Sequence, residues 1–188
     1  MEVTVEICPP DEWESMVKIF TEMEEHYYGK GIIQEALLKH YLSNRLFSPL
    51  SATLVLRARR DAEITGLACC TILYPSPRYS GEMHIKELYV SRRERGKGTG
   101  KCLMRIMAKL ALKNECRNLS WNAEKSNAEA NGFYQSLGGK INSDIVNYYL
   151  HGHLLSELAS GSPALSGDSA GQAVAPIWPA SRAEGTAE

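Results

Sequence analysis

The chain has 188 residues, a length that suits one domain with its own hydrophobic core. Its 44% of hydrophobic and 23% of charged residues are ordinary for a globular protein, and a formal net charge of -1 gives no electrostatic reason to expect nucleic acid as a partner. No apolar run reaches the length of a membrane span, no signal-peptide pattern opens the chain and the five cysteines form no C-x-x-C pair, so we expect a cytoplasmic protein without a membrane partner.

The first half of the chain predicts one strand, two helices and two further strands. Apolar and polar residues alternate over 3–8, which is typical of a strand. The segment 11–25 begins with Asp, a good N-cap, and carries apolar residues at helical spacing; a second amphipathic helix follows over 36–42. Residues 52–58 are strand-like, and 64–73 is apolar on both sides, which indicates a central strand.

The second half predicts a strand over 83–90, a basic glycine-rich loop over 91–100 and a core-facing helix over 99–114. A strand over 119–123 and a helix over 127–137 follow, and Gly138-Gly139 ends that helix. This order of elements predicts a mixed α/β (α+β) fold around one sheet.

The C-terminal part of the chain is expected to end the domain and then to lose regular structure. Residues 140–150 are β-like and suggest a hairpin or two strands, and 154–159 suggests a last helical turn. From residue 160 onward Ala, Gly, Ser and Pro dominate. We therefore expect a domain over 1–159 and a disordered tail over 160–188.

The sharpest local feature is the glycine-rich loop, in which a strand leads directly into a helix through Gly96, Gly98 and Gly100. A helix N-terminus exposes unpaired N–H groups and a partial positive charge, and glycines let an anion approach the backbone closely. Basic side chains add charge for a ligand with more than one phosphate; they are Arg95, Lys97 and Lys101. The spacing fits neither a Walker loop nor the dinucleotide fingerprint G-x-G-x-x-G.

The run Arg95-x-x-Gly98-x-Gly100 resembles the pyrophosphate-binding signature [RQ]-x-x-G-x-[GA] of the GNAT superfamily of acetyl-CoA-dependent N-acetyltransferases. Residues 85–90 are similar to the fourth strand of that family, and 121–138 to its fifth strand and following helix. The resemblance rests on the order and spacing of all three segments. It is clearest over 64–139, and the tail lies outside it.

This resemblance implies a central, mostly antiparallel sheet flanked by helices, with fourth and fifth strands that splay apart around the thioester arm of acetyl-CoA. A bulge in the fourth strand would help to open the gap. A backbone N–H near Leu88 would stabilise the oxyanion, Asn127 would contact the pantetheine arm and Ala130 would leave room for it. The cofactor-binding residues that it implies are Leu88, Tyr89, Val90, Arg95, Gly96, Lys97, Gly98, Thr99, Gly100, Lys101, Asn127, Ala130 and Phe133.

Two residues are candidates for proton transfer. Tyr134 would be the general acid that protonates the departing thiolate of CoA; alternatively it is a core aromatic at helical spacing beside Phe133. Glu87 would accept a proton from the amine substrate; we expect it on the same strand face as Ile85 and Tyr89. The alternative for Glu87 is a surface carboxylate in a salt bridge with a neighbouring strand.

The turn after the first helix is the candidate acceptor site, because the resemblance places it over the amine. His26 and Tyr27 are expected to line this site, and aromatic faces there suit a cationic amine. The nearby Glu24 and Glu25 belong to the same turn, with a solvated helix end as the alternative.

The resemblance thus implies an N-acetyltransferase that moves the acetyl group of acetyl-CoA directly to an amine, for example of a polyamine, an amino acid or an antibiotic. A protein or peptide amine as acceptor and a non-catalytic acyl-CoA sensor stay open as alternatives. The histidines near strand ends lack the further ligands of a metal site, so no metal is expected. A homodimer paired through the last strands also stays open.

Overall fold

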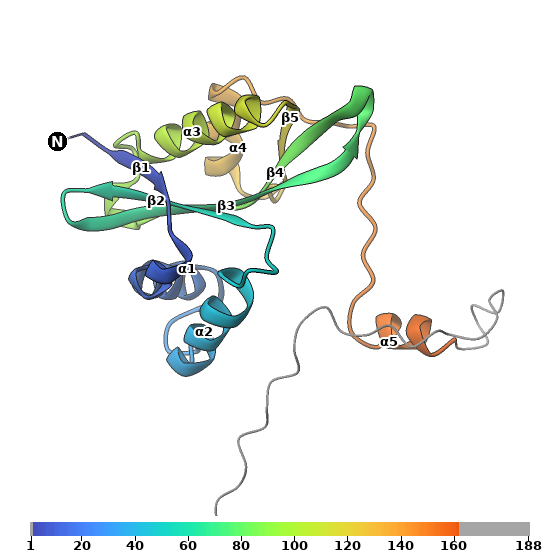
Figure 1. Cartoon of the computed structure of the whole chain (residues 1–188), viewed down its shortest axis with the longest axis horizontal. Helices are drawn as coiled ribbons and strands as arrows, with labels where there is room; N and C mark the ends of the chain where they lie inside the picture. Colours follow the sequence, from blue (N-terminus) through green and yellow to red (C-terminus); the bar gives the residue numbers. More distant parts are fainter. Residues whose placement is uncertain (1, 162–188) are drawn as a thin grey trace, which may run out of the picture. The chain divides into compact units, whose positions relative to one another are not determined.

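The computed structural model of the chain describes residues 2–161, which divide after Leu137 into two units that are described separately. A five-stranded sheet of order β1-β2-β3-β4-β5 organises the first unit (Figure 1). Its strands are β1 (Thr4–Ile7), β2 (Leu54–Arg60), β3 (Glu63–Ser76), β4 (Ser80–Val90) and β5 (Cys116–Trp121). Neighbouring strands pair antiparallel except β4 and β5, which are parallel. The expected mixed α/β fold with a mostly antiparallel sheet is confirmed.

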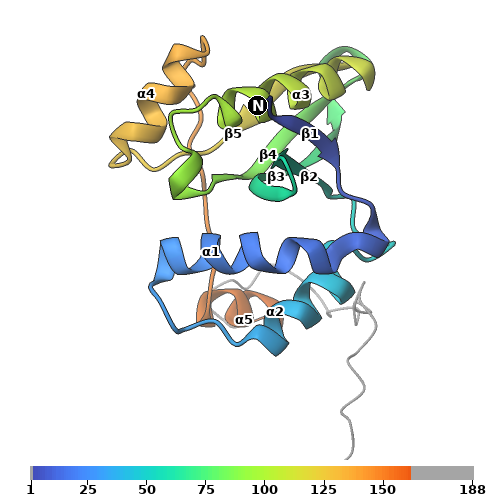
Figure 2. The same ribbon diagram turned by 90° about the vertical axis from the view of Figure 1, so that its left-hand side faces the viewer.

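Helices cover both faces of this sheet. On one face lie α1 (Val17–Tyr28) and α2 (Glu35–Tyr41), and α3 (Thr99–Lys113) lies on the other (Figure 2). The fourth helix of this unit, α4 (Ala128–Ser136), follows β5. Because both faces are covered, the central strand β3 is buried on both sides over most of its length, as its apolar sequence predicts.

Two clusters of buried side chains form the core, one on each face of the sheet. The first joins the sheet to α1 and α2 and includes Met16, Phe20, Leu42, Leu67, Cys69 and Tyr89. The second joins the sheet to α3 and includes Leu56, Cys70, Met83, Ile85, Leu103 and Met107. Fully burying one such side chain contributes roughly 2 kcal/mol, so the two clusters together fix both helical layers against the sheet.

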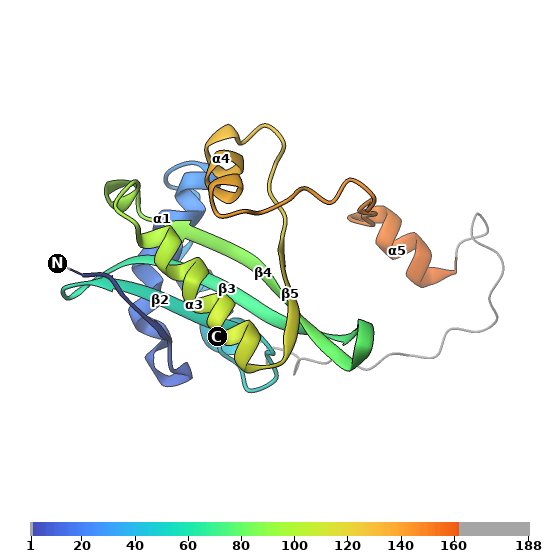
Figure 3. The same ribbon diagram turned by 90° about the horizontal axis from the view of Figure 1, so that it is seen from above.

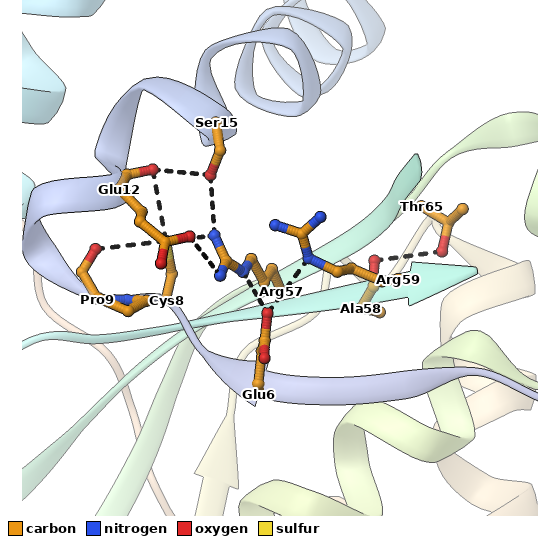
Figure 4. Close-up of polar contacts among 9 residues, drawn as sticks. All are labelled: Glu6, Cys8, Pro9, Glu12, Ser15, Arg57, Ala58, Arg59 and Thr65. Atoms are coloured by element: carbon orange, nitrogen blue, oxygen red, sulfur yellow. Dashed lines mark hydrogen bonds and ion pairs between the residues drawn. The ribbon is translucent and has the colours of Figure 1, made fainter. Parts of the chain in front are cut away.

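A buried arginine ties the N-terminal segment to the sheet (Figure 4). The Arg57 side chain on β2 pairs with Glu6 through Nε at 2.7 Å and with Glu12 through Nη2 at 2.6 Å, and its Nη1 donates to Ser15 Oγ at 3.0 Å. The hydrogen bond from Arg57 is the main reason that the pKa of Glu6 is lowered. A buried guanidinium is costly unless it is paired, so these partners make its burial possible.

The start of the first helix differs from the expectation. A 3₁₀ segment, η1 (Pro10–Met16), precedes α1, and Asp11 does not cap an α-helix. Glu12 has non-helical dihedral angles of φ -100° and ψ 16° while its carboxylate is held by Arg57. The α-helix therefore begins only at Val17.

The loop expected over 75–81 is also shorter in the structure. β3 continues to Ser76 and β4 begins at Ser80, so that only Pro77–Tyr79 separates them. Arg78 and Tyr79 both adopt φ near +60°, which lets the chain reverse over three residues.

The second unit, described over 138–161, contains one helix, α5 (His153–Ser160), where a single turn was expected. The strands expected over 140–150 are wrong: this segment has no regular secondary structure, and Ile141 and Tyr148 are 80% and 91% exposed. Its apolar residues follow one another, as in Tyr148-Tyr149-Leu150, and do not mark one face of a strand. The boundary at 159 stays a prediction, and the expected tail falls outside the described residues from 162 onward.

Between residues 2 and 161, no helix is both long and apolar enough to cross a membrane.

Candidate active site

A bulge in β4 determines which side chains face the site. Cys69 on β3 pairs with Glu87, but the next residue of β3 pairs with Ile85, so Lys86 is an extra residue in β4. As a result Ile85 packs into the cluster against α3, whereas Glu87 lies opposite Cys69 on the face of α1 and α2. The expectation that Glu87 shares a face with Ile85 is wrong, because one inserted residue reverses the alternation.

The fourth and fifth strands part beyond this bulge, as expected. Their parallel pairing ends at Ile85 and Trp121. Seen from above, β4 continues to the loop before α3 while β5 turns away toward α4 (Figure 3). One edge of the backbone from Lys86 to Val90 therefore has no neighbouring strand. An extended ligand can pair with a strand edge of this kind.

The glycine loop forms an open cradle of backbone amides. Gly96 and Gly98 have φ of +73° and +86°, and a Cβ atom at either position would meet no heavy atom within 4 Å. Gly98 starts α3 without a side-chain cap, and the first bond of this helix runs from the Cys102 N–H to the Gly98 carbonyl. The N–H groups of the first turn thus have no partner in the helix and border open space. This arrangement fits a diphosphate.

Carboxylates hold part of the positive charge of this loop. Lys97 Nζ lies 3.0 Å from Glu94, and Arg60 Nε lies 2.7 Å from the same carboxylate. Hydrogen bonds from Lys97 and Arg60 lower the pKa of Glu94. Lys101 is exposed, and the Thr99 side chain is buried, so Thr99 offers a ligand only its backbone. Backbone amides are therefore the main diphosphate donors that the loop presents.

The side chain of Arg95 points back into the protein. Its Nε donates to the Val90 carbonyl at 3.3 Å, and its Nη2 lies 3.1 Å from His26 Nε2. Glu129 on α4 is 3.9 Å from Nη1, and the guanidinium lies 5.9 Å from the centre of the Tyr89 ring. Arg95 therefore joins β4, α1 and α4, and the Val90 carbonyl is already engaged.

α4 brings three of the implied cofactor residues to the same region. Asn127 is the N-cap of this helix, where its side-chain oxygen accepts from the Ala130 N–H at 3.0 Å, so its amide nitrogen is the group that remains for a ligand. Phe133 packs against the loop so closely that a Cβ at Gly100 would lie 3.3 Å from its ring. The loop and α4 thus form the two sides of the same site.

Tyr134 lies beside the point where the strands part. Its ring centre is 5.1 Å from that of Trp121, the last paired residue of β5. The side chain is half-buried, and this burial, with the nearby Glu87 carboxylate, raises its pKa. A phenol with a raised pKa keeps its proton at neutral pH and is ready to donate it.

Carboxylates and phenols gather around Glu87. Burial, with a further contribution from Glu24, raises the pKa of the half-buried Glu87 side chain. The pKa values of Tyr27 and Tyr41 are likewise raised, first by burial and then also by the Glu87 charge. Within residues 2–161 Glu87 takes part in no salt bridge, which does not favour the alternative of a paired surface carboxylate.

Sequence reasoning missed Glu22, whose carboxylate accepts hydrogen bonds from Tyr89, from Ser91 and from the Arg92 N–H. Burial, with the adjacent Glu22 charge, raises the pKa of Tyr89 to about 12. Glu22 and His26 are four residues apart and so share one face of α1; this spacing is the only signal in the sequence that could have found the pair.

Across the described part of the chain, no three His, Cys, Asp or Glu side chains gather as a metal site requires. His84 Nδ1 instead lies 2.9 Å from Ser120 Oγ on β5.

Residues 13–139 match the model of the acetyltransferase (GNAT) family. An integron cassette protein, VCH_CASS6, from the mobile metagenome of V. cholerae is 36% identical, with 85% of this chain and 98% of that chain covered and a TM-score of 0.81. The search of curated proteins found no match.

Two more distant solved structures share the fold. An aminoglycoside acetyltransferase from an uncultured soil metagenomic sample, in complex with sisomicin, has a TM-score of 0.65 at 16% identity over 79% of this chain and 95% of that chain. A ribosomal-protein-alanine N-acetyltransferase from Brucella melitensis has a TM-score of 0.62 at 19% identity over 80% and 99%. On the family match and the splayed strands, this chain belongs to the GNAT family and is an N-acetyltransferase.

Proposed function

We propose that this enzyme transfers the acetyl group of acetyl-CoA directly to a primary amine of a small cationic molecule. The observation that carries the proposal is the unpaired edge of β4 leading directly to the amide cradle at the start of α3. An edge that pairs with an extended arm and a cradle that accepts a diphosphate together suit the shape of coenzyme A.

The side chains at the site then have distinct tasks. Glu87 accepts the proton that an ammonium group must lose before its nitrogen attacks. A backbone N–H near Leu88 donates to the thioester oxygen as negative charge develops on it. The nitrogen forms a bond to the acetyl carbon while the bond from that carbon to sulfur breaks, and Tyr134 gives its proton to the departing thiolate.

The acceptor is proposed to be cationic because of the groups near Glu87. Glu24 and Glu87 contribute negative charge on the side of the sheet that α1 and α2 cover, and both raise the pKa of Tyr41 after burial itself. The exposed ring of Tyr27 adds an aromatic face. The sisomicin-bound aminoglycoside acetyltransferase, which shares the fold, offers one example of a polycationic acceptor.

A protein amine is the second candidate, since a ribosomal-protein-alanine N-acetyltransferase shares the same fold. The test is release of free thiol from acetyl-CoA in the presence of diamines, amino acids, aminoglycosides and basic peptides. Turnover with the small cations and none with peptides is expected. Turnover with peptides alone would contradict the acceptor class, and absence of any CoA affinity would contradict the proposal itself.

A further inference from the structure

α1 contacts the start of the glycine loop through a single carboxylate oxygen. Glu22 Oε1 lies 2.8 Å from Ser91 Oγ, 3.1 Å from the Tyr89 hydroxyl and 3.2 Å from the Arg92 backbone nitrogen. All three groups donate to it. They belong to consecutive residues at which β4 ends and the loop begins. Hydrogen bonds to a charged acceptor are stronger than neutral ones, so this oxygen is a firm point of attachment.

The sheet and the loop itself hold the same residues from other sides. The Ser91 N–H donates to the Thr65 carbonyl on β3 at 2.9 Å, and the Ser91 carbonyl accepts from the Glu94 N–H at 2.8 Å. Ser91 is buried. The side chain of Glu22 therefore completes a set of bonds that determines the direction in which the chain leaves β4, five residues before Gly96.

A second contact lies one helical turn further along α1. His26 Nε2 is 3.1 Å from Arg95 Nη2, and the His26 ring centre lies 5.8 Å from that of Tyr89. Arg95 comes directly before Gly96 in the loop. The same face of α1 thus holds the loop at its first residues through Glu22 and just before its glycines through His26.

We propose that Glu22 is a positioning residue, which holds the loop in the shape that binds the diphosphate of acetyl-CoA; this inference rests on the proposed function. Amides bind an anion well only when they already converge on one point. The loop has two glycines with positive φ, and nothing fills the space beside them. A segment of this kind samples other shapes unless its ends are held, and Glu22 holds the first end.

The same contact gives α1 a role in both halves of the site. Tyr27 follows His26 on this helix, and its pKa is raised by burial and then by Glu87 and Tyr134, so it faces the proposed catalytic groups. Glu22 therefore fixes the helix of the acceptor side against the loop of the cofactor side.

The experiment measures the dissociation constant of CoA by calorimetry at 25 °C, together with the melting temperature of each variant. Apparent affinity falls in proportion to the fraction of molecules with a competent loop. If that fraction drops to about a tenth in Glu22→Ala, the dissociation constant rises about tenfold. Glu22→Gln keeps an oxygen acceptor in place and is expected to restore affinity to within about threefold of the wild type.

Glu63→Ala is the matched control. It also removes one carboxylate, and the partner of Glu63 is Lys18 on α1, but this salt bridge is exposed and far along the helix from the loop contact. Its CoA affinity is expected to equal that of the wild type. Ser91→Ala should weaken CoA binding too, and the double variant with Glu22→Ala should be no weaker than the worse single variant, because both changes break one contact.

The outcomes separate this inference from the proposed function. If the wild type binds CoA and Glu22→Ala binds it equally well, Glu22 does not position the loop. If Glu22→Ala only lowers the melting temperature, its role is merely structural and the inference is likewise overturned. If the wild type itself fails to bind CoA, the proposed function fails first. An increase in KM for acetyl-CoA with kcat at saturation nearly unchanged supports the positioning role.

Discussion

Ile85 and Trp121 are the last residues at which β4 and β5 pair, and the ring of Tyr134 rests on that same Trp121. The proposed general acid is therefore attached to the point where the sheet opens. Beyond it, five residues of β4 have an unpaired edge, which is roughly 16 Å of backbone at 3.3 Å per residue. A group fixed at the inner end of this edge is well placed to meet the reacting end of an extended thioester arm.

Replacing Tyr134 with Phe is expected to lower kcat by about 10²–10³ and to leave CoA affinity nearly unchanged, because only the proton donor is lost. The raised pKa of Tyr134 means that its ionisation should not reduce kcat of the wild type at any pH below 10, its ordinary pKa. Thiol release measured between pH 6 and 10 tests both statements. Tyr79→Phe, a fully exposed tyrosine at the tip of the hairpin, is the control. Equal turnover of Tyr134→Phe and wild type would remove Tyr134 as the acid.

Replacing Gly98 with Val is expected to abolish measurable CoA binding. At φ +86° a β-branched residue is strained by about 1–3 kcal/mol, and its side chain would enter the open space that the loop keeps for the diphosphate. Calorimetry with CoA measures the loss, and a thermal melt measures the strain. Gly132→Ala in α4 is the control, because its φ is ordinary and its Cβ meets nothing; it should stabilise the helix by about 0.5–1 kcal/mol. Unchanged CoA affinity of Gly98→Val would contradict the role of the loop.

The parts of the site that lie close together in sequence could be predicted from it. The loop needs three glycines, a preceding strand and a following helix, and all of these occur within 83–114. Tyr134 and Asn127 could be placed because one helix carries them at a fixed spacing from the same motif. Local chemistry of this kind leaves few alternatives.

Relationships between distant segments could not be predicted. The bulge at Lys86 depends on how β4 pairs with β3, and a run of alternating residues does not reveal where one extra residue is accommodated. The partners of Arg57 and Glu22 are 51 and 69 residues away, at Glu6 and Ser91, and a charged residue in an amphipathic pattern has no feature that names such a partner.

Replacing Arg57 with Ala is expected to destabilise the fold by about 2–3 kcal/mol. Loss of one partner from a buried ion pair typically costs about 3–5 kcal/mol, but the carboxylates of Glu6 and Glu12 are about half-exposed and water can replace part of what they lose. Urea unfolding at pH 7 measures the change. Arg59→Ala is the control, since Arg59 also contacts Glu6 but is more exposed, and it should cost less than 1 kcal/mol. Equal losses for the two variants would contradict the role of burial.

Glu87→Gln is expected to lower activity and to raise stability at the same time. As the proposed base, Glu87 should account for about 10²–10⁴ in kcat, and wild-type activity should fall as the pH drops through its raised pKa. Burial raises that pKa above the ordinary 4.5, so the folded protein binds the proton more tightly than the unfolded chain does. Ionised Glu87 therefore destabilises the wild type, and this penalty is absent below pH 4.5 and present in full once the pH exceeds the raised pKa.

Gln is neutral at every pH, and within the described residues Glu87 has no hydrogen bond to lose. The melting temperature of Glu87→Gln should therefore exceed that of the wild type at pH 7, and the two should converge below pH 4.5. Thermal melts from pH 4 to 8 and thiol release over the same range measure the two effects. Glu63→Gln, at an exposed carboxylate, should change neither. Full activity of Glu87→Gln at pH 7 would show that another group accepts the proton, and an unchanged melting temperature would show that the carboxylate is better solvated than its surroundings indicate.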